Sequence, residues 1–148
     1  MKNLKSSYDE CINNGMIYSL REVDIEKILN MKDIAYEDLE AINYINKDKI
    51  NTLFKLHYDI IHILSEALLI FYRISSANHL CLFTYLCTKY RDFDWLFFEE
   101  IRNKRNDLNY GGKPINISQW PRIRAKMIEY IHALSKELES KIHNFNKP

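Results

Sequence analysis

The sequence predicts an all-α fold, an up-and-down helical bundle of four to five main helices, and three observations lead to it. The 148 residues include only 3 Gly and 3 Pro, and neither type occurs between Met16 and Tyr110. A many-stranded β fold needs frequent tight turns, which such a stretch can hardly supply. Apolar residues recur at helical spacing along most of the chain. The composition, 47% hydrophobic and 28% charged, is that of a globular domain able to bury a core. We therefore expect a single helical domain over 1–148.

The N-terminal part, 1–45, is predicted to contain two helices. The first ends at Asn13-Asn14-Gly15, because glycine adopts the left-handed conformation that commonly follows a helix. The second, over 24–45, has apolar residues three or four positions apart and an outer face rich in Asp and Glu. We expect these two helices to precede a helical core over 46–143.

The core is predicted to begin with a long central helix. Asn46 is the expected N-cap, and one apolar seam then runs from Ile50 to Phe71. Ser75-Ser76 interrupts the pattern. The short helix that follows, over 77–90, is apolar around most of its circumference, which predicts either burial or an oligomer interface.

Two further helices complete the predicted core. Asp92 or Asp94 can cap the first of them, and the run Gly111-Gly112-Lys113-Pro114 ends it. Ser118 is the expected N-cap of the last helix, in which Pro121 falls in the tolerated first turn.

The net charge of +1 conceals a concentrated basic segment. Residues 1–100 contain 11 Lys and Arg against 16 Asp and Glu, whereas residues 101–126 contain 7 against 1. An antiparallel helical hairpin would gather these cations, and arginine binds phosphate oxygens in pairs. The segment therefore predicts either an anion site for phosphate or an ordinary solvated turn.

Helical geometry favours the anion site. At about 100° per residue, five groups able to form hydrogen bonds share one side of the helix, bordering its buried seam: Arg102, Arg105, Asn106, Asn109 and Tyr110. With Lys113 in the turn and Arg122 on the next helix, the predicted phosphate- or RNA-binding residues are Arg102, Arg105, Asn109, Lys113 and Arg122.

From about His57 to Leu138 the chain resembles the HEPN domain family, small helical bundles marked by an arginine, commonly followed by Asn, and a His four to six residues further on. The segment Arg105-Asn106-Asp107-Leu108-Asn109-Tyr110-Gly111 is similar to this motif. Many HEPN proteins are metal-independent ribonucleases, often toxins of toxin–antitoxin or defence systems, and pair into dimers that join two motifs in one cleft. Others bind nucleotides or RNA, or are inactive partners.

The chain departs from the family at the motif histidine. With four to six residues between the arginine and the histidine, a motif histidine paired with Arg105 would fall at Tyr110, Gly111 or Gly112. In active members the arginine steadies the scissile phosphate and the histidine takes part in proton transfer. Either catalysis is lost here, or another group such as His79 or Asp107 substitutes. The catalytic candidates are Arg105, Asn106 and Tyr110.

The resemblance thus implies an RNA- or nucleotide-phosphate-associated protein of toxin–antitoxin or defence type, with ribonuclease activity weakened or lost. One alternative is an active metal-independent endoribonuclease, so whether the protein is an enzyme stays open. Another is a non-catalytic dimerisation or interaction module. The partners expected are a second copy of the chain, forming a homodimer, RNA or a nucleotide, and a nucleotidyltransferase-type protein.

Metals, disulfides and membranes are not expected. The three cysteines are odd in number and form no CxxC pair, which argues against a disulfide framework and a zinc site. The interpretation is a reduced, cytoplasmic protein without a cofactor or a membrane-spanning segment.

Three histidines and a tryptophan are further candidates for a site or for the core. His57 and His62 are five residues apart, which does not give a metal pair on a helix, so both are expected in the core. His79 can cap a helix, pack or line a cleft. Trp120, beside the basic turn, can stack on a base or belong to the core.

Overall fold

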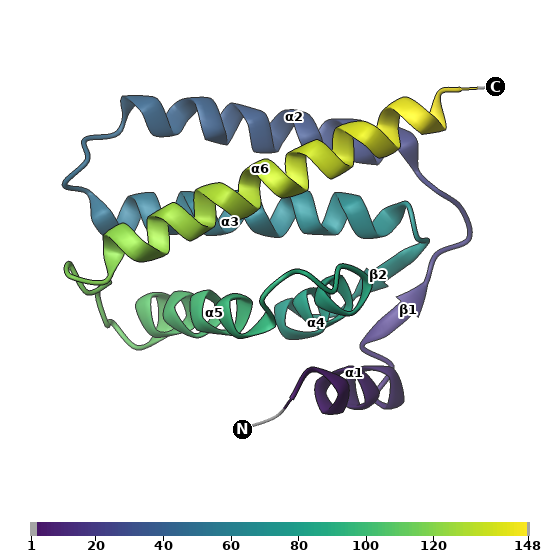
Figure 1. Cartoon of the computed structure of the whole chain (residues 1–148), viewed down its shortest axis with the longest axis horizontal. Helices are drawn as coiled ribbons and strands as arrows, with labels where there is room; N and C mark the ends of the chain where they lie inside the picture. The colour runs from purple at the N-terminus through teal and green to yellow at the C-terminus, as the bar shows by residue number, and fades with distance from the viewer. Residues whose placement is uncertain (1–2, 148) are drawn as a thin grey trace.

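The computed structural model describes residues 3–147 and shows a helical bundle with one small β ladder (Figure 1). Its elements are, in order, α1 (Leu4–Asn13), β1 (Ile17–Ser19), α2 (Ile25–Ala41), the 3-10 turn η1 (Ile42–Tyr44), α3 (Ile50–Ile70), β2 (Ile74–Ser76), α4 (His79–Lys89), α5 (Trp95–Tyr110) and α6 (Trp120–Phe145). The all-α prediction is confirmed apart from the two three-residue strands. The six α-helices of the described residues correspond in order to the two N-terminal helices and the four core helices predicted.

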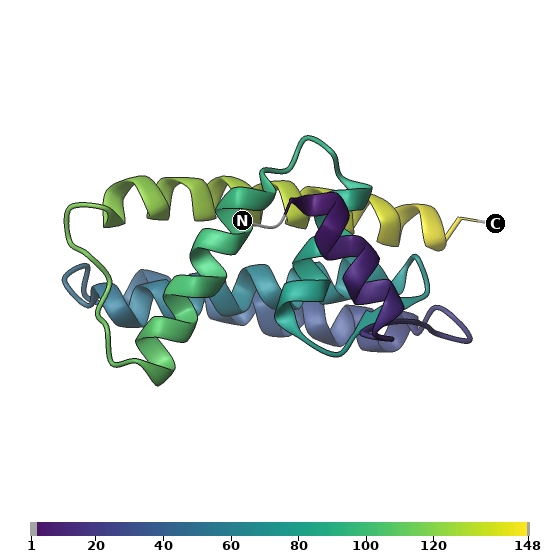
Figure 2. The same ribbon diagram turned by 90° about the horizontal axis from the view of Figure 1, so that it is seen from below.

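Helix α3 is the central element. Helices α2 and α6 pack against it, and α4 lies between α3 and α1 (Figure 1). Helix α5 starts beside α6, where the Asp94 N–H donates to the Tyr130 hydroxyl at 2.8 Å, and then diverges from α6 towards its own C-terminal end (Figure 2). Helix α5 also packs against α3 and α4.

The core is formed mainly by large apolar side chains of α3, α4, α5 and α6. The largest that are fully buried are Tyr58, Phe54, Phe83 and Phe98. In α4 every residue from Cys81 to Cys87 is buried, because α1, α3 and α5 surround this helix. Burial within the chain therefore accounts for the apolar circumference of the short helix, and the homodimer stays a prediction.

Two predicted helix ends are confirmed by local geometry. Gly15 has a φ of +67° directly after α1, as the left-handed position requires. The side chain of Asp94 accepts a hydrogen bond from the Leu96 N–H at 3.1 Å and caps α5.

Two predicted N-caps are wrong. Helix α3 begins at Ile50 because Asn46 instead forms a turn, its side chain accepting from the Asp48 N–H at 3.2 Å. Helix α6 begins at Trp120 because Ser118 instead donates its hydroxyl to Asn116. In both places a polar side chain stabilises the turn before the helix.

The break predicted at Ser75-Ser76 is part of a short antiparallel ladder. Strand β2 pairs with β1 in the register Ile17↔Ser76, Tyr18↔Ser75 and Ser19↔Ile74. The Ala77 N–H also donates to the Met16 carbonyl at 2.8 Å. This ladder connects the N-terminal segment to the start of α4.

The absence of a disulfide is also a wrong prediction. Cys11 in α1 and Cys81 in α4 form a disulfide with a Cα–Cα distance of 5.7 Å, and Cys87 is a buried free cysteine. The paired residues are 70 positions apart in the sequence, so only the packing of α1 on α4 brings them together. The assignment of these two cysteines to a reduced state is corrected accordingly.

A search of the helices within residues 3–147 finds none with the length and apolar character needed to cross a bilayer.

Candidate functional site

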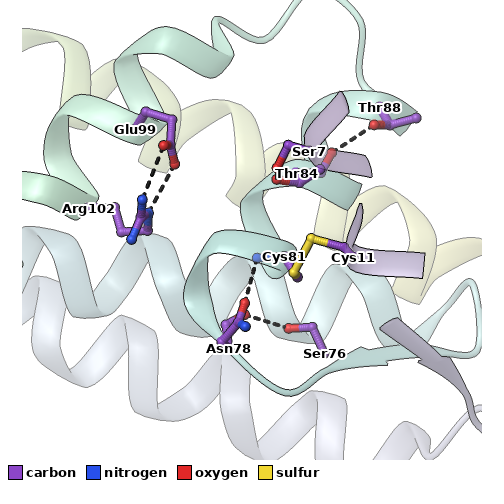
Figure 3. Close-up of a disulfide and its surroundings, with 9 residues drawn as sticks. All are labelled: Ser7, Cys11, Ser76, Asn78, Cys81, Thr84, Thr88, Glu99 and Arg102. Carbon is purple, nitrogen blue, oxygen red and sulfur yellow. Dashed lines mark hydrogen bonds and ion pairs between the residues drawn. A yellow bond between two sulfur atoms is a disulfide. The ribbon is translucent and has the colours of Figure 1, made fainter. Parts of the chain in front are cut away.

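Arg102 lies half-buried on α5, beside the buried Ile101, as the helical geometry predicts. Its guanidinium makes a two-point contact with Glu99 one turn earlier, Nε to Oε1 at 3.0 Å and one terminal nitrogen to Oε2 at 3.1 Å (Figure 3). A guanidinium has five N–H donors, so those that Glu99 does not use can still reach an anion.

Arg105 is the second half-buried arginine of α5. Its guanidinium carbon lies 5.3 Å from the centre of the Tyr58 ring, in a cation–π contact with α3. Arg105 forms no ion pair with any residue that the structure describes. None of the hydrogen bonds between described residues uses an Arg105 N–H, so these donors are available for a bidentate contact with an anion.

One histidine contacts the same tyrosine, and a second histidine stacks on the first. The Tyr58 hydroxyl is 2.9 Å from Nδ1 of His79, and the rings of His79 and His62 stack with their centres 3.9 Å apart. Tyr58 and His62 are four residues apart and thus share a face of α3. His79 is the first residue of α4, which Asn78 caps by accepting from the Cys81 N–H at 2.8 Å.

These contacts define an arginine–histidine cluster on α3, α4 and α5, made up of Tyr58, His62, His79, Arg102 and Arg105. Both arginines also act electrostatically on His79 and on Tyr58. The cluster therefore combines two cationic groups, two imidazoles and a buried phenol.

Both histidines of the cluster are uncharged at neutral pH. Burial, His79 and Arg105 together lower the pKa of His62 to about 4. Burial, Arg105 and Arg102 lower the pKa of His79. A neutral imidazole can accept a proton, whereas an anion placed between the rings and the arginines would favour the imidazolium form.

Tyr58 fixes the orientation of the His79 ring. Burial raises the pKa of Tyr58, so the phenol keeps its proton. The contact with Nδ1 of His79 accommodates either tautomer: Nδ1 accepts from the phenol, or Nδ1 donates and Nε2 is left to take up a proton. In the second tautomer His79 has the form required of a general base.

A carboxylate lies close to His62, one of the two stacked histidines. Glu66 Oε1 is 3.7 Å from Nε2 of His62, one turn along α3. Burial raises the pKa of Glu66, and Lys27 partly offsets this effect. His62 thus lies between His79 and an acidic group.

The other predicted site residues lie outside the cluster. Asn106 is half-buried next to Arg105, whereas Asn109, Lys113 and Tyr110 are exposed, Tyr110 by 80%. In residues 3–147 no hydrogen bond, ion pair or ring contact joins these residues to Tyr58, His62 or His79.

The predicted gathering of all seven cations at one anion site does not occur. Arg122 makes a two-point contact with Glu100 on α5, at 3.0 and 2.6 Å, and Lys126 lies 3.2 Å from Asp94. Arg122 and Lys126 of α6 thus pair with an acidic residue of α5 and with the N-cap of α5, while Arg102 and Arg105 face α3 and α4.

His57 and Trp120 are core residues, which settles two of the interpretations. His57 is 2% exposed, with Nδ1 2.6 Å from the Leu53 carbonyl, and the edge of its ring meets Trp120 at 5.8 Å. His62 lies at the edge of the core, where its half-buried ring packs on Phe83 and stacks on His79. No local pattern indicates that contact, since the stacking partner comes from another helix.

The described part of the chain has no group of three or more His, Cys, Asp or Glu side chains arranged to hold a metal ion. Comparison of the chain with protein-family models, with curated proteins and with solved structures finds no match. The functional inference therefore rests on the cluster and on the resemblance of the Arg105-Asn106 segment.

Proposed function

We propose that the arginine–histidine cluster binds the phosphate groups of single-stranded RNA or of a nucleotide. The observation that carries the proposal is the convergence of Arg105 and Arg102 with His62 and His79 in one half-buried place. Guanidinium groups bind phosphate oxygens bidentately, and partial burial strengthens that contact. Imidazoles that become protonated on binding would add to the attraction.

The HEPN resemblance supplies the proposed biological setting. It supports a role in a toxin–antitoxin or defence-type system, with a second copy of the chain or a nucleotidyltransferase-type protein as partner. The lack of a histidine shortly after Arg105 supports weakened or lost ribonuclease activity. Tyr110, which stands at that place in the sequence, is largely exposed, and no hydrogen bond or ring contact of the described chain joins it to His62 or His79.

A salt series of RNA binding tests the proposal. The affinity of a labelled single-stranded RNA should fall as salt rises from about 50 to 200 mM, and Arg105→Ala should reduce both the affinity and the salt slope. Loss of charge-assisted hydrogen bonds worth about 1.5–3 kcal/mol corresponds to roughly 10- to 150-fold weaker binding.

Arg91→Ala is the matched control, because it removes the same charge from the α4–α5 connection, where Arg91 lines a different pocket with residues of α1. We expect it to bind RNA nearly as well as the wild type. Binding that does not depend on salt, or that both substitutions weaken equally, would contradict the proposal.

A second candidate function is a metal-independent endoribonuclease, which the position of His79 favours. Neutral His79 would take the proton of a ribose 2′-hydroxyl as that oxygen attacks the phosphorus. The 5′-oxygen would leave with a proton from solvent, and Arg105 would balance the charge that develops on the phosphoryl oxygens. Tyr58 would be a positioning residue that holds the imidazole.

Incubation of RNA with the protein in EDTA tests this second function. We expect a 2′,3′-cyclic phosphate on the upstream fragment, and loss of cleavage with His79→Gln or Arg105→Ala. Cleavage that both variants retain would identify a contaminating nuclease, and no cleavage by the wild type would leave binding as the function.

A further inference from the structure

The disulfide between Cys11 and Cys81 joins α1 to the first turn of α4 (Figure 3). This is the turn that carries His79, two residues before Cys81. The Cys81 N–H is also the donor in the cap formed by Asn78. The covalent bond therefore holds the same short segment that positions one histidine of the cluster.

Other contacts hold α1 on α4 without a covalent bond. The hydroxyl groups of Ser7 and Thr84 form a buried hydrogen bond of 2.8 Å, and the Tyr8 and Tyr85 rings lie 6.2 Å apart. Strands β1 and β2 connect the two segments at their ends. Without the disulfide, α1 would thus stay attached but open more often.

A small surface pocket gives access to the disulfide. Its volume is about 140 Å³, and Cys11 and Cys81 both line it, together with polar groups that include Asn78. The two cysteines are each 3% exposed, so the disulfide is largely covered and this pocket is the opening beside it. Reduction of the folded protein would require a small thiol to reach a sulfur atom from this pocket.

We propose that the Cys11–Cys81 disulfide is a reversible redox link that controls the order of the His79 turn and, through it, the phosphate-binding site. A reducing thiolate attacks one sulfur and forms a mixed disulfide, releasing the other cysteine as a thiolate that takes up a proton. A second reducing thiolate attacks the sulfur of the first in the mixed disulfide, and the remaining protein cysteine leaves as a thiolate that takes up a proton. The protein disulfide gains two electrons and two protons, and two molecules of the thiol become one disulfide.

The consequence for binding rests on the proposed function. In the reduced protein the first turn of α4 loses its covalent attachment to α1, and His79 spends less time stacked on His62. If the ordered turn is populated about one-tenth of the time, the apparent affinity for RNA falls roughly tenfold.

The test compares oxidised protein with protein reduced by glutathione under native conditions. Alkylation after acid quenching should show one free thiol per chain before reduction and all three afterwards. Far-UV circular dichroism should stay helical. Amide hydrogen exchange should quicken at least about tenfold in α1 and in the first turn of α4, with α6 unchanged as the internal reference.

The double variant Cys11→Ser/Cys81→Ser is the control for the chemistry, because glutathione should alter neither its exchange nor its RNA affinity. The experiment on the wild type keeps the test valid if this variant does not fold. Resistance to reduction until the protein is denatured, or loss of helix on reduction, would show a purely structural disulfide and overturn the proposal.

The RNA measurement separates this inference from the proposed function. If reduction quickens amide exchange but leaves the RNA affinity unchanged, the disulfide does not control the phosphate-binding site. Absence of RNA binding in both redox states rejects the proposed function, and the exchange result then decides on the redox link by itself.

Discussion

The pH dependence of stability gives a direct test of the environment assigned to His62. We expect acidification from pH 7 to pH 5 to destabilise the wild type, and His62→Gln to remove much of that loss. Glutamine is polar but does not titrate in this range. It can therefore occupy the half-buried position without carrying the proton.

The sign follows from where histidine titrates in the two states. In the unfolded chain the imidazole has a pKa of 6.5, whereas burial, His79 and Arg105 lower the pKa of His62 to about 4 in the folded protein. Between these values the unfolded state binds more protons. The stability contributed by His62 is therefore present above pH 6.5 and is lost as the pH falls towards 4.

The magnitude follows from the same two values. Linkage between a pKa of 6.5 and one of about 4 reduces the free energy of unfolding by about 2 kcal/mol between pH 7 and pH 5. The side chain of His62 is 22% exposed, so solvent screening leaves most of this effect. Burial raises the pKa of the neighbouring Glu66, so its protonation favours the folded state as the pH falls. This effect opposes that of His62 and is present in both the wild type and the variant.

Urea unfolding followed by circular dichroism at pH 7 and pH 5 measures the effect, and the difference between wild type and variant isolates His62. His132→Gln, an exposed histidine of α6, is the matched control and should behave like the wild type. Equal losses of stability in the wild type and in His62→Gln would refute the buried, uncharged state assigned to this residue.

Further predictions concern ligand binding, the buried contacts and the surface. Saturation with inorganic phosphate or single-stranded RNA should raise the pKa of both cluster histidines, seen in NMR titrations, because an anion favours the imidazolium; unchanged titration curves would exclude an anion there. Ser7→Ala should cost about 1–3 kcal/mol in urea unfolding, because it leaves the buried Thr84 hydroxyl unpaired, and adding Thr84→Val should recover part of that loss. Phe83→Ala should cost about 3–5 kcal/mol, since the ring is fully buried between helices, and a cost below about 1 kcal/mol would contradict the packing. Arg122→Ala should change the unfolding free energy by less than about 1 kcal/mol, because its ion pair lies at the surface.

The helices could be predicted from the sequence because helix signals are local. Apolar residues at helical spacing locate α3 and α6, and Gly15 and Asp94 mark the ends they were expected to mark. The predicted N-caps at Asn46 and Ser118 are wrong, and the reason is local too. A polar side chain before an apolar run can stabilise either the first turn of the helix or the loop that precedes it.

Part of the candidate site could be predicted in the same way. The spacing of Arg102 and Arg105 on one helix places both beside the core edge, where the structure has them. An antiparallel hairpin of this helix and the last helix predicts that Lys113 and Arg122 join the two arginines. The structure instead pairs Arg122 with Glu100 on α5, whereas Arg102 and Arg105 face α3 and α4.

What the sequence by itself determined is the helical class, the main helices and the arginine-bearing face of α5, because each depends on residues within a few turns of one another. The tertiary structure alone decided which groups face those arginines. The stacking of His62 on His79, the Tyr58 contact with both α4 and Arg105, and the Cys11–Cys81 disulfide join segments that lie far apart in the chain. Such contacts form only when the buried faces of several helices pack together, and no local spacing encodes them.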